Sequence, residues 1–145
     1  MNCSLFVVDD DLTYQRLIKL IFVKYPVFKH VLYFNDGKEL LRYLTEFRDD
    51  AANLPDLIFL DLNMPDLDGW SVLDTIEKMY RKLDKKVIVY IVSVSIRLID
   101  KERASEYSFV REFISKPLYK DKIISIAEEF NNNLIAANEK TTPLN

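Results

Sequence analysis

The chain has 145 residues, of which 49% are hydrophobic and 30% charged, a composition typical of one soluble globular domain and not of a disordered chain. Its net charge of −3 argues against a general binder of nucleic acid or anionic membranes. Cys3 is the single cysteine, which excludes an internal disulfide and a cysteine zinc cluster. No apolar run approaches the roughly 20 residues that cross a bilayer. We therefore expect a cytoplasmic protein without membrane or nucleic-acid partners.

Short apolar runs recur along the chain and predict five strands. Four of the runs are almost wholly apolar, which is typical of strands covered by helices on both faces. The last run contains Arg111 and Glu112, which favours an edge position in the sheet. The predicted strands are Leu5–Val8, Val31–Phe34, Leu57–Leu60, Val87–Val92 and Val110–Ile114.

Segments with helical periodicity alternate with these runs. In the first segment, Leu17, Ile18 and Ile21 belong to an apolar stripe that predicts one buried face. Asp11 or Thr13 can cap this helix. The alternation predicts an α/β domain with a parallel sheet between helical layers. The apolar stripes lie within residues 14–25, 40–47, 73–83, 98–107 and 123–134, and the fourth is the least regular.

The sequence contains no internal repeat and no sign of a second domain. We assign residues 1–130 to one domain and residues 131–145 to the end of the last helix and a flexible C-terminal tail.

Polar side chains follow the predicted strands at the points where the strands end. Asp9 and Asp10 follow the first strand, and Asp61 follows the third. Ser93 follows the fourth strand, and Lys116 comes just after the fifth. In open parallel sheets, ligands bind outside the carboxyl ends of the strands. We therefore expect three carboxylates, a hydroxyl and an amine at one rim of the sheet.

The expected rim has a definite chemistry. Three ionised carboxylates at short range repel one another unless a cation lies among them. Mg²⁺ prefers oxygen ligands and takes one or two carboxylates. One carboxylate can then attack a phosphoryl donor, while Lys116 neutralises charge and Ser93 hydrogen-bonds a phosphoryl oxygen. The sequence thus predicts phosphoryl transfer assisted by Mg²⁺.

Several motifs resemble the receiver domains of response regulators in two-component signalling. They are Phe6–Asp11, Asp56–Gly69, Val89–Ser93 and Phe113–Leu118. The acidic pair, the D-x-N-M-P-x-x-D-G segment and the Lys-Pro pair, in that order, make the resemblance specific. It implies an α/β flavodoxin-like (βα)5 fold, a five-stranded parallel sheet of order 2-1-3-4-5, and a stand-alone receiver similar to the chemotaxis receiver.

The resemblance also implies roles for individual residues. Asp61 would be the phospho-acceptor and, together with Asp10, a direct ligand of Mg²⁺. Asp9 would bind the ion through water, and Asn63 through its backbone carbonyl. Such a protein would not be an enzyme in the ordinary sense, because it would catalyse only its own phosphorylation and dephosphorylation.

The switch and the partners are implied in the same way. Lys116 would bind the phosphoryl group, and Ser93 and Phe113 would form the switch pair. The donor would be a sensor histidine kinase or a phosphotransfer protein. The downstream protein would dock on the face made by the fourth helix, fifth strand and fifth helix. The chain would be a monomer or a weak dimer.

The sequence departs from the family pattern beside the switch residue. Ser93 replaces the commoner threonine, and Val94 occupies a position where the family usually has a very small residue. The branched side chain of Val94 could narrow the access to Asp61. In another register of the strand, Ser95 would be the switch residue. The segment 95–99 is rich in apolar residues on the expected signalling face.

Two other functions stay open. A receiver-like scaffold that works without phosphorylation would tolerate a blocked pocket, and Val94 leaves room for it. A magnesium-dependent phosphohydrolase with an aspartyl-phosphate intermediate would need a general acid two residues after the nucleophile, where this chain has Asn63.

Overall fold

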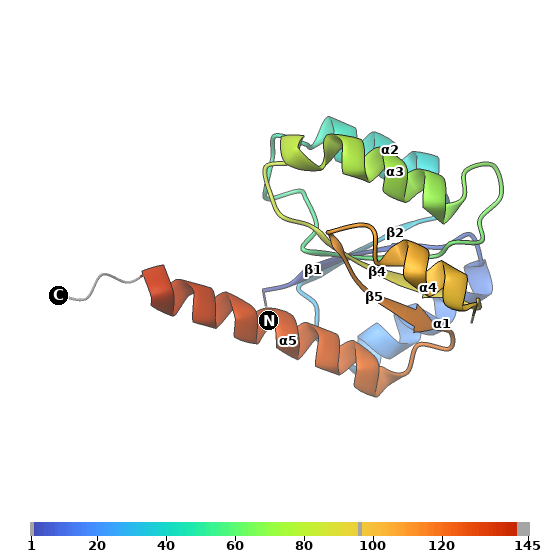
Figure 1. The fold of residues 1–145 in the computed structure, drawn as a ribbon. Coiled ribbons are helices and arrows are strands. Elements are labelled where there is room, and N and C mark those ends of the chain that lie inside the picture. The colour runs from blue at the N-terminus through green and yellow to red at the C-terminus, as the bar shows by residue number, and fades with distance from the viewer. Residues whose placement is uncertain (1, 96, 142–145) are drawn as a thin grey trace.

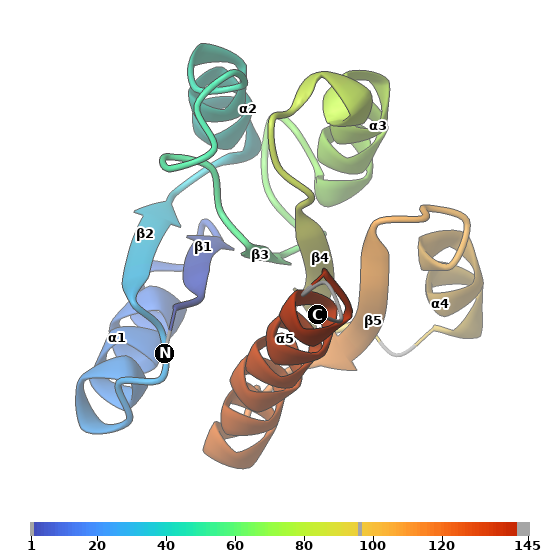
Figure 2. The same ribbon diagram turned by 90° about the vertical axis from the view of Figure 1, so that its left-hand side faces the viewer.

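The computed structural model describes residues 2–95 and 97–141. Five parallel strands form one sheet in the order β2-β1-β3-β4-β5, as Figures 1 and 2 show. The predicted order is therefore confirmed. The strands are β1 (Ser4–Val8), β2 (His30–Phe34), β3 (Leu57–Leu60), β4 (Ile88–Ser93) and β5 (Val110–Ser115).

Helices follow the strands in strict alternation. Helices α2 and α3 cover one face of the sheet, and α1 and α5 cover the other (Figure 1). This is the flavodoxin-like (βα)5 architecture that the sequence predicted. The helices are α1 (Leu12–Lys24), α2 (Gly37–Glu46), α3 (Gly69–Met79), α4 (Leu98–Ala104) and α5 (Lys120–Thr141), with a 3-10 turn at Tyr80–Lys82. In the described part of the chain, no helix is both long and apolar enough to span a membrane.

Each face of the sheet carries its own hydrophobic core. Phe6 and Val8 of β1 pack into the core on the α2 and α3 side. Leu5 and Val7 of the same strand pack into the core on the α1 and α5 side. This alternation is the period of two that a strand imposes on its side chains. Burial on both faces fixes the register of the strands, and hence the level at which each strand ends.

The two edge strands are less covered than the central ones. Strand β5 is an edge, as predicted, and its register with β4 shifts between Val89 and Tyr90, so that Arg111 has no partner in the ladder. Strand β2 forms the other edge, and Leu32 on it is 41% exposed. The expectation that helices cover this strand on both faces is therefore wrong.

The buried face of α1 differs from the predicted stripe. Gln15, Ile18 and Phe22 point into the protein, whereas Leu17 is 52% exposed. The helix is turned so that the amide of Gln15 reaches backbone carbonyls at the sheet end. A buried amide needs hydrogen-bond partners, and in this orientation of the helix the Gln15 side chain has them.

Helix α5 runs on past the predicted domain end, through Asn131–Asn133, as far as Thr141. Figure 1 shows this end of α5 leaving the body of the domain, and Leu134 on it is 41% exposed. The predicted buried stripe therefore ends earlier than expected. The domain boundary at residue 130 stays a prediction, and the last residues of the predicted tail, 142–145, lie outside the described residues, as does Ile96 in the apolar segment 95–99.

Candidate functional site

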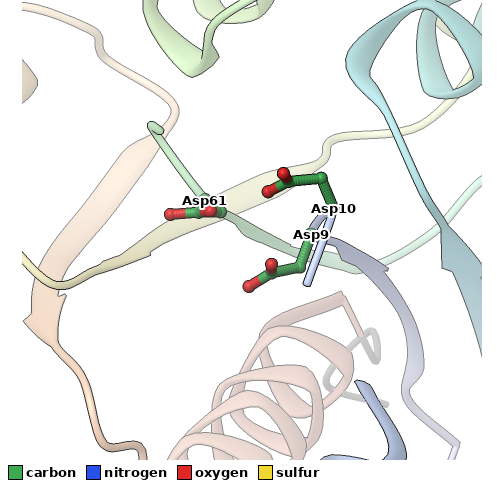
Figure 3. Close-up of side chains that lie close together, drawn as sticks. All are labelled: Asp9, Asp10 and Asp61. Carbon is green, nitrogen blue, oxygen red and sulfur yellow. The ribbon is translucent and has the colours of Figure 1, made fainter. Parts of the chain in front are cut away.

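The three predicted carboxylates meet at one rim of the sheet. Asp9 and Asp10 follow β1, and Asp61 follows β3. One carboxylate oxygen from each lies within 4.8 Å of the other two (Figure 3). Asp9 and Asp61 are 2% and 5% exposed, whereas Asp10 faces solvent. Their convergence follows from the pairing of β1 directly with β3, which brings the two strand ends side by side.

The electrostatics of this rim are unfavourable for the carboxylates alone. Burial, followed by the nearby charge of Asp9, raises the pKa of Asp61 to about 6, although Lys116 and the backbone N–H of Asn63 act in the opposite direction. A cation placed among the carboxylates would favour the ionised form of Asp61. Two buried carboxylates and an exposed one form an all-oxygen set that is open to water on one side. This donor set fits Mg²⁺, which keeps part of its water shell when bound.

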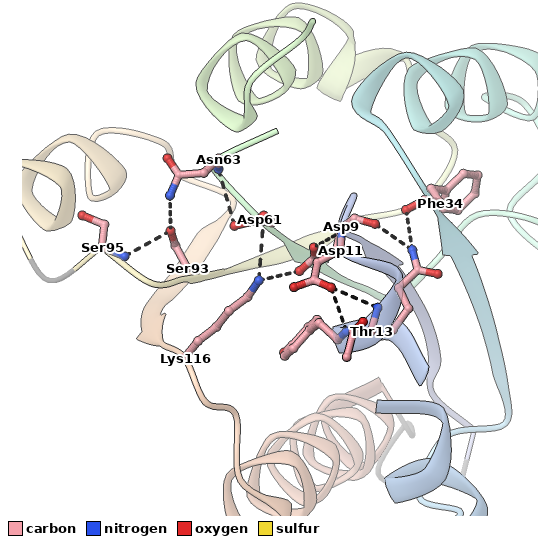
Figure 4. A network of polar contacts seen from close by, with 11 residues as sticks. Asp9, Asp11, Thr13, Phe34, Asp61, Asn63, Ser93, Ser95 and Lys116 are labelled. Atoms are coloured by element: carbon pink, nitrogen blue, oxygen red, sulfur yellow. Dashed lines mark hydrogen bonds and ion pairs between the residues drawn. The ribbon is translucent and has the colours of Figure 1, made fainter. Parts of the chain in front are cut away.

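Lys116 lies beside the two buried carboxylates, Asp9 and Asp61. Its Nζ donates a hydrogen bond to Asp9 Oδ2 at 2.6 Å and lies 3.8 Å from Asp61 Oδ2 (Figure 4). Its backbone N–H donates to the carbonyl of Ser93 at 2.8 Å. The ammonium also lies 4.1 Å from the centroid of the Tyr14 ring. The structure thus brings the predicted amine to the rim, beside Asp9 and Asp61.

Ser93 is the last residue of β4 and is fully buried. Its hydroxyl accepts hydrogen bonds from the Asn63 side chain and from the Ser95 backbone N–H, both at 3.4 Å. The backbone N–H of Asn63 donates in turn to Asp61 Oδ1 at 3.4 Å (Figure 4). Asn63 therefore bridges the carboxylate of Asp61 and the hydroxyl of Ser93.

Ser95, the alternative switch residue, is directed elsewhere. Its hydroxyl donates to Asp100 Oδ2 at 2.5 Å, and Asp100 also accepts from the guanidinium of Arg97. The hydrogen bonds from Ser95 and Arg97 hold the pKa of Asp100 below its usual range. Asp100 lies in the first turn of α4. The geometry therefore favours Ser93 for the rim and gives Ser95 a place in the anchoring of α4.

Phe113 lies on β5, where it pairs with Ile91 of β4. Its ring is half-buried against the core on the α2 and α3 side. Ser115, two residues further on, is the partner of Ser93. The two residues of the predicted switch pair thus occupy adjacent strands.

The loop after β3 is shaped by close backbone contacts. The N–H of Gly69 donates to the carbonyl of Leu62 at 2.9 Å. A Cβ at Gly69 would lie 2.6 Å from the carbonyl oxygen of Asp61 and 2.7 Å from Leu62 Cα. Asp66 adopts a φ of 65° in the same loop, and Asp68 caps α3 through a bond from Ser71 N–H. Glycine at position 69 therefore lets α3 start close to Asp61.

A cavity of about 600 Å³ opens beside the rim. Asn63, Trp70 and Val94 are among the residues that line it. Val94 is 66% exposed, so its branched side chain stands at the surface of this opening.

Sequence reasoning missed Gln15. This side chain is 3% exposed, and its Nε2 lies 2.7 Å from the carbonyl of Asp9 and 3.1 Å from the carbonyl of Phe34. It also contacts Asn35 Oδ1 at 3.2 Å. The amide therefore joins the ends of β1 and β2 just where the acidic pair begins. A signal was present, because a polar residue at position 15 lies three residues before Ile18 on the same helix face.

Comparisons with known proteins agree with this geometry. Residues 5–128 match the family described as "Response regulator receiver domain". The chain is 27% identical over 139 residues to the probable methanogenesis regulatory protein FilR2 of Methanothrix harundinacea, covering 96% of this chain and 88% of that protein. Its fold resembles a two-component response regulator from Cytophaga hutchinsonii (TM-score 0.80, 24% identity, 91% of this chain, 99% of that one). It also resembles the chemotaxis protein CheY4 of Vibrio cholerae (TM-score 0.70, 16% identity, 89% and 98%).

Proposed function

The chain belongs to the response regulator receiver domain family, and we propose that it is a single-domain response regulator that switches on phosphorylation of Asp61. The donor is a sensor histidine kinase or a phosphotransfer protein. The observation that carries the proposal is the meeting of Asp9, Asp10 and Asp61 within 4.8 Å, with Lys116 beside them. An acceptor carboxylate, acidic neighbours for a cation and an ammonium are the parts that phosphoryl transfer to an aspartate requires.

The reaction depends on Mg²⁺ held at the acidic rim. Asp10 and Asp61 would hold the ion directly, Asp9 would hold it through water, and Asn63 would contribute its backbone carbonyl. When bound, Mg²⁺ supplies positive charge that offsets the carboxylates and the oxygens of the phosphoryl group. The exposed position of Asp10 and the raised pKa of Asp61 both support a cation at this place.

The residues of the chain carry the transfer itself. A carboxylate oxygen of Asp61 attacks phosphorus, and the bond from phosphorus to the donor breaks, so that the donor leaves with the bonding electron pair. Lys116 then exchanges Asp9, at 2.6 Å, for a phosphoryl oxygen. Ser93 turns its hydroxyl from Asn63 to another phosphoryl oxygen. Both groups stabilise charge on the product and need no proton transfer.

Movement of Ser93 changes the surface around α4. The hydroxyl gives up the N–H of Ser95, whose own side chain holds Asp100 at the start of α4. Phe113 turns inward behind Ser93. The phosphorylated form then favours one of two arrangements of the face made by α4, β5 and α5, which binds a downstream protein.

The remaining features of the proposal follow from this role. The protein catalyses only its own phosphorylation and dephosphorylation, works in the cytoplasm, and is a monomer or a weak dimer. It has no need of nucleic acid or membrane as a partner.

The experiment uses acetyl phosphate as the donor. The protein is incubated with and without Mg²⁺, and its intact mass is measured beside Asp61→Asn and, as a matched control, Asp66→Asn from the exposed part of the same loop. We expect one phosphoryl adduct that requires Mg²⁺ and Asp61 and survives in Asp66→Asn. Acetate leaves as the phosphoryl group is bound.

Two results would replace the proposal. A folded protein without an adduct from acetyl phosphate or from a phosphorylated kinase would be a phosphorylation-independent scaffold, a reading that the exposed Val94 leaves open. Rapid, continuous hydrolysis of the donor would indicate a phosphohydrolase, although Asn63 cannot serve as its general acid.

A further inference from the structure

Tyr14 brings an aromatic ring to the rim, and the proposed reaction assigns it no part. It lies in the first turn of α1, where its backbone N–H donates to Asp11 Oδ1 at 3.1 Å. The ring packs against the core on the α1 and α5 side. The cap and the packing together fix the direction of the ring, so its place beside Lys116 is set by the fold.

Among the described residues, the ammonium of Lys116 contacts groups of two kinds, carboxylates and an aromatic ring. Asp9 Oδ2 lies at 2.6 Å, Asp61 Oδ2 at 3.8 Å, and the centroid of the Tyr14 ring at 4.1 Å. The Lys116 side chain is only 13% exposed. A lysine ammonium on a flexible stem needs contacts on several sides to hold one position, and an aromatic face supplies such a contact through its negative quadrupole.

The ring and the carboxylate act differently when a phosphoryl group arrives. Asp9 competes with the phosphoryl oxygens for the N–H donors of Lys116, because each oxygen accepts a hydrogen bond. The ring binds the ammonium as a cation and leaves its hydrogen-bond directions free. Lys116 can thus change its hydrogen-bond partner while it keeps its aromatic contact.

We propose that Tyr14 is a positioning residue for Lys116, whose ring face holds the ammonium beside Asp61 before and after phosphoryl transfer. The proposal rests on the proposed function of Asp61. Tyr14 does not alter the bonds that are made and broken in the transfer. Asp61 forms a bond to phosphorus, the bond from phosphorus to acetate breaks, and acetate leaves with the electron pair. Tyr14 acts only through Lys116.

The first measurement needs no phosphorylation. Protons above an aromatic ring resonate at high field, so NMR of protein labelled in its lysines should show the Lys116 Cε methylene shifted upfield. Lys116→Met identifies the signal. We expect the shift to persist in Tyr14→Phe and to vanish in Tyr14→Leu. An unshifted Lys116 signal in the unmodified protein would overturn the proposal, whatever the outcome for Asp61.

The second measurement is the rate of adduct formation with acetyl phosphate and Mg²⁺. Tyr14→Phe should keep the rate, and Tyr14→Leu should lower it about three- to tenfold, the range that a partly buried cation–π contact supports. In a Lys116→Met background, Tyr14→Leu should cause no further loss, because the two side chains act as one unit. Tyr119→Leu is the control, because Tyr119 is 70% exposed, and it should keep the rate of the unmodified protein.

The outcomes separate the two proposals. Equal rates for the unmodified protein and Tyr14→Leu would overturn the role of Tyr14. So would a loss of rate on Tyr14→Leu that is as large in the Lys116→Met background as in the unmodified protein. Absence of any adduct in the unmodified protein would instead contradict the role of Asp61, and the NMR measurement would still decide whether Tyr14 holds Lys116. Thermal unfolding of each variant identifies a general loss of structure.

Discussion

Val94 lines the cavity beside the acidic rim, together with Asn63 and Trp70. We predict that a small donor approaches Asp61 past Val94, since Asn63, which also lines this cavity, donates its backbone N–H to Asp61. Val94→Ala removes two methyl groups from a side chain that is 66% exposed, so we expect faster adduct formation with acetyl phosphate and little change in stability. The initial rate of adduct formation, followed by intact mass, is the measurement.

Leu98→Ala is the matched control, since it shortens an apolar side chain of similar exposure, 70%, on α4. Its rate should stay at that of the unmodified protein. Equal rates for Val94→Ala and the unmodified protein would show that Val94 does not limit access.

A second prediction concerns the buried side chain of Gln15. Gln15→Met keeps the volume but removes the N–H donors that reach the carbonyls of Asp9 and Phe34. Buried acceptors that lose a donor cost about 1–3 kcal/mol, so we expect a loss of this order in the free energy of unfolding, together with weaker Mg²⁺ binding by calorimetry. Arg16→Met, on the exposed side of the same helix, should change neither. Unaltered Mg²⁺ affinity in Gln15→Met would mean that this amide does not position the acidic pair.

These residues show what a sequence can and cannot predict about the site. The meeting of Asp9 and Asp61 was predictable, because both follow apolar runs whose ends share one edge of a parallel sheet. The contacts of Gln15 and Tyr14 were not, although the position of Gln15 on the face of Ile18 was a signal that it could be buried. Each depends on the rotation of α1 about its axis, which is set by contacts with strand ends distant in sequence.

At the scale of elements, α4 is a short helix with an unusual anchor. Ser95 and Arg97 both donate to the buried carboxylate of Asp100, and Ser95 also donates its backbone N–H to Ser93. The start of α4 is therefore tied to the residue that is proposed to move. A helix of seven residues has little stability of its own, so we expect this anchor to limit how often it opens.

Asp100→Asn tests this anchor. The amide that replaces one carboxylate oxygen cannot accept both sets of hydrogen bonds, so the first turn of α4 should open more often. We expect faster hydrogen exchange in residues 98–104 while the strands keep their protection. Glu102→Gln, an exposed change of the same kind on α4, should leave exchange unaltered. The same exchange rate in both variants would contradict the anchoring role of Asp100.

Some helices and strands were easier to predict from the sequence than others. The central strands were clear because they are apolar throughout, as their burial on both faces requires. The stripe predicted for helix α1 was only partly right, because Leu17 is exposed whereas Ile18 is buried. The length of α5 was underestimated because its polar residues 131–133 suggested an end, whereas the helix continues beyond the sheet.

At the scale of the whole molecule, the acidic rim should lower stability when no cation is bound. The pKa of Asp61 rises from 3.8 to about 6 on folding, so the folded state binds this proton more tightly than the unfolded state. Ionisation above pH 6 therefore costs stability, up to roughly 3 kcal/mol for a shift of this size. The cost should disappear as the pH falls through about 6 towards 4.

Urea unfolding at several pH values checks this prediction. Without Mg²⁺, Asp61→Asn should be more stable than the unmodified protein at pH 7, and the difference should shrink as the pH falls to about 4. Saturating Mg²⁺ should stabilise the unmodified protein at pH 7 more than Asp61→Asn, since binding to the folded state alone adds stability. A difference between the two proteins that does not vary with pH would contradict the link to Asp61.

In the proposed function, the acidic rim and the α4 and β5 surface are parts of one switch. The most direct test of this switch is a backbone amide NMR spectrum with Mg²⁺, recorded before and after addition of beryllofluoride, a stable mimic of the phosphoryl group. We predict shifted signals at Asp61, at Ser93 and Ser95, along α4, and at Phe113 of β5. Shifts confined to residues 9–11 and 61–63, with α4 and β5 unchanged, would show that the rim binds the mimic without switching the surface.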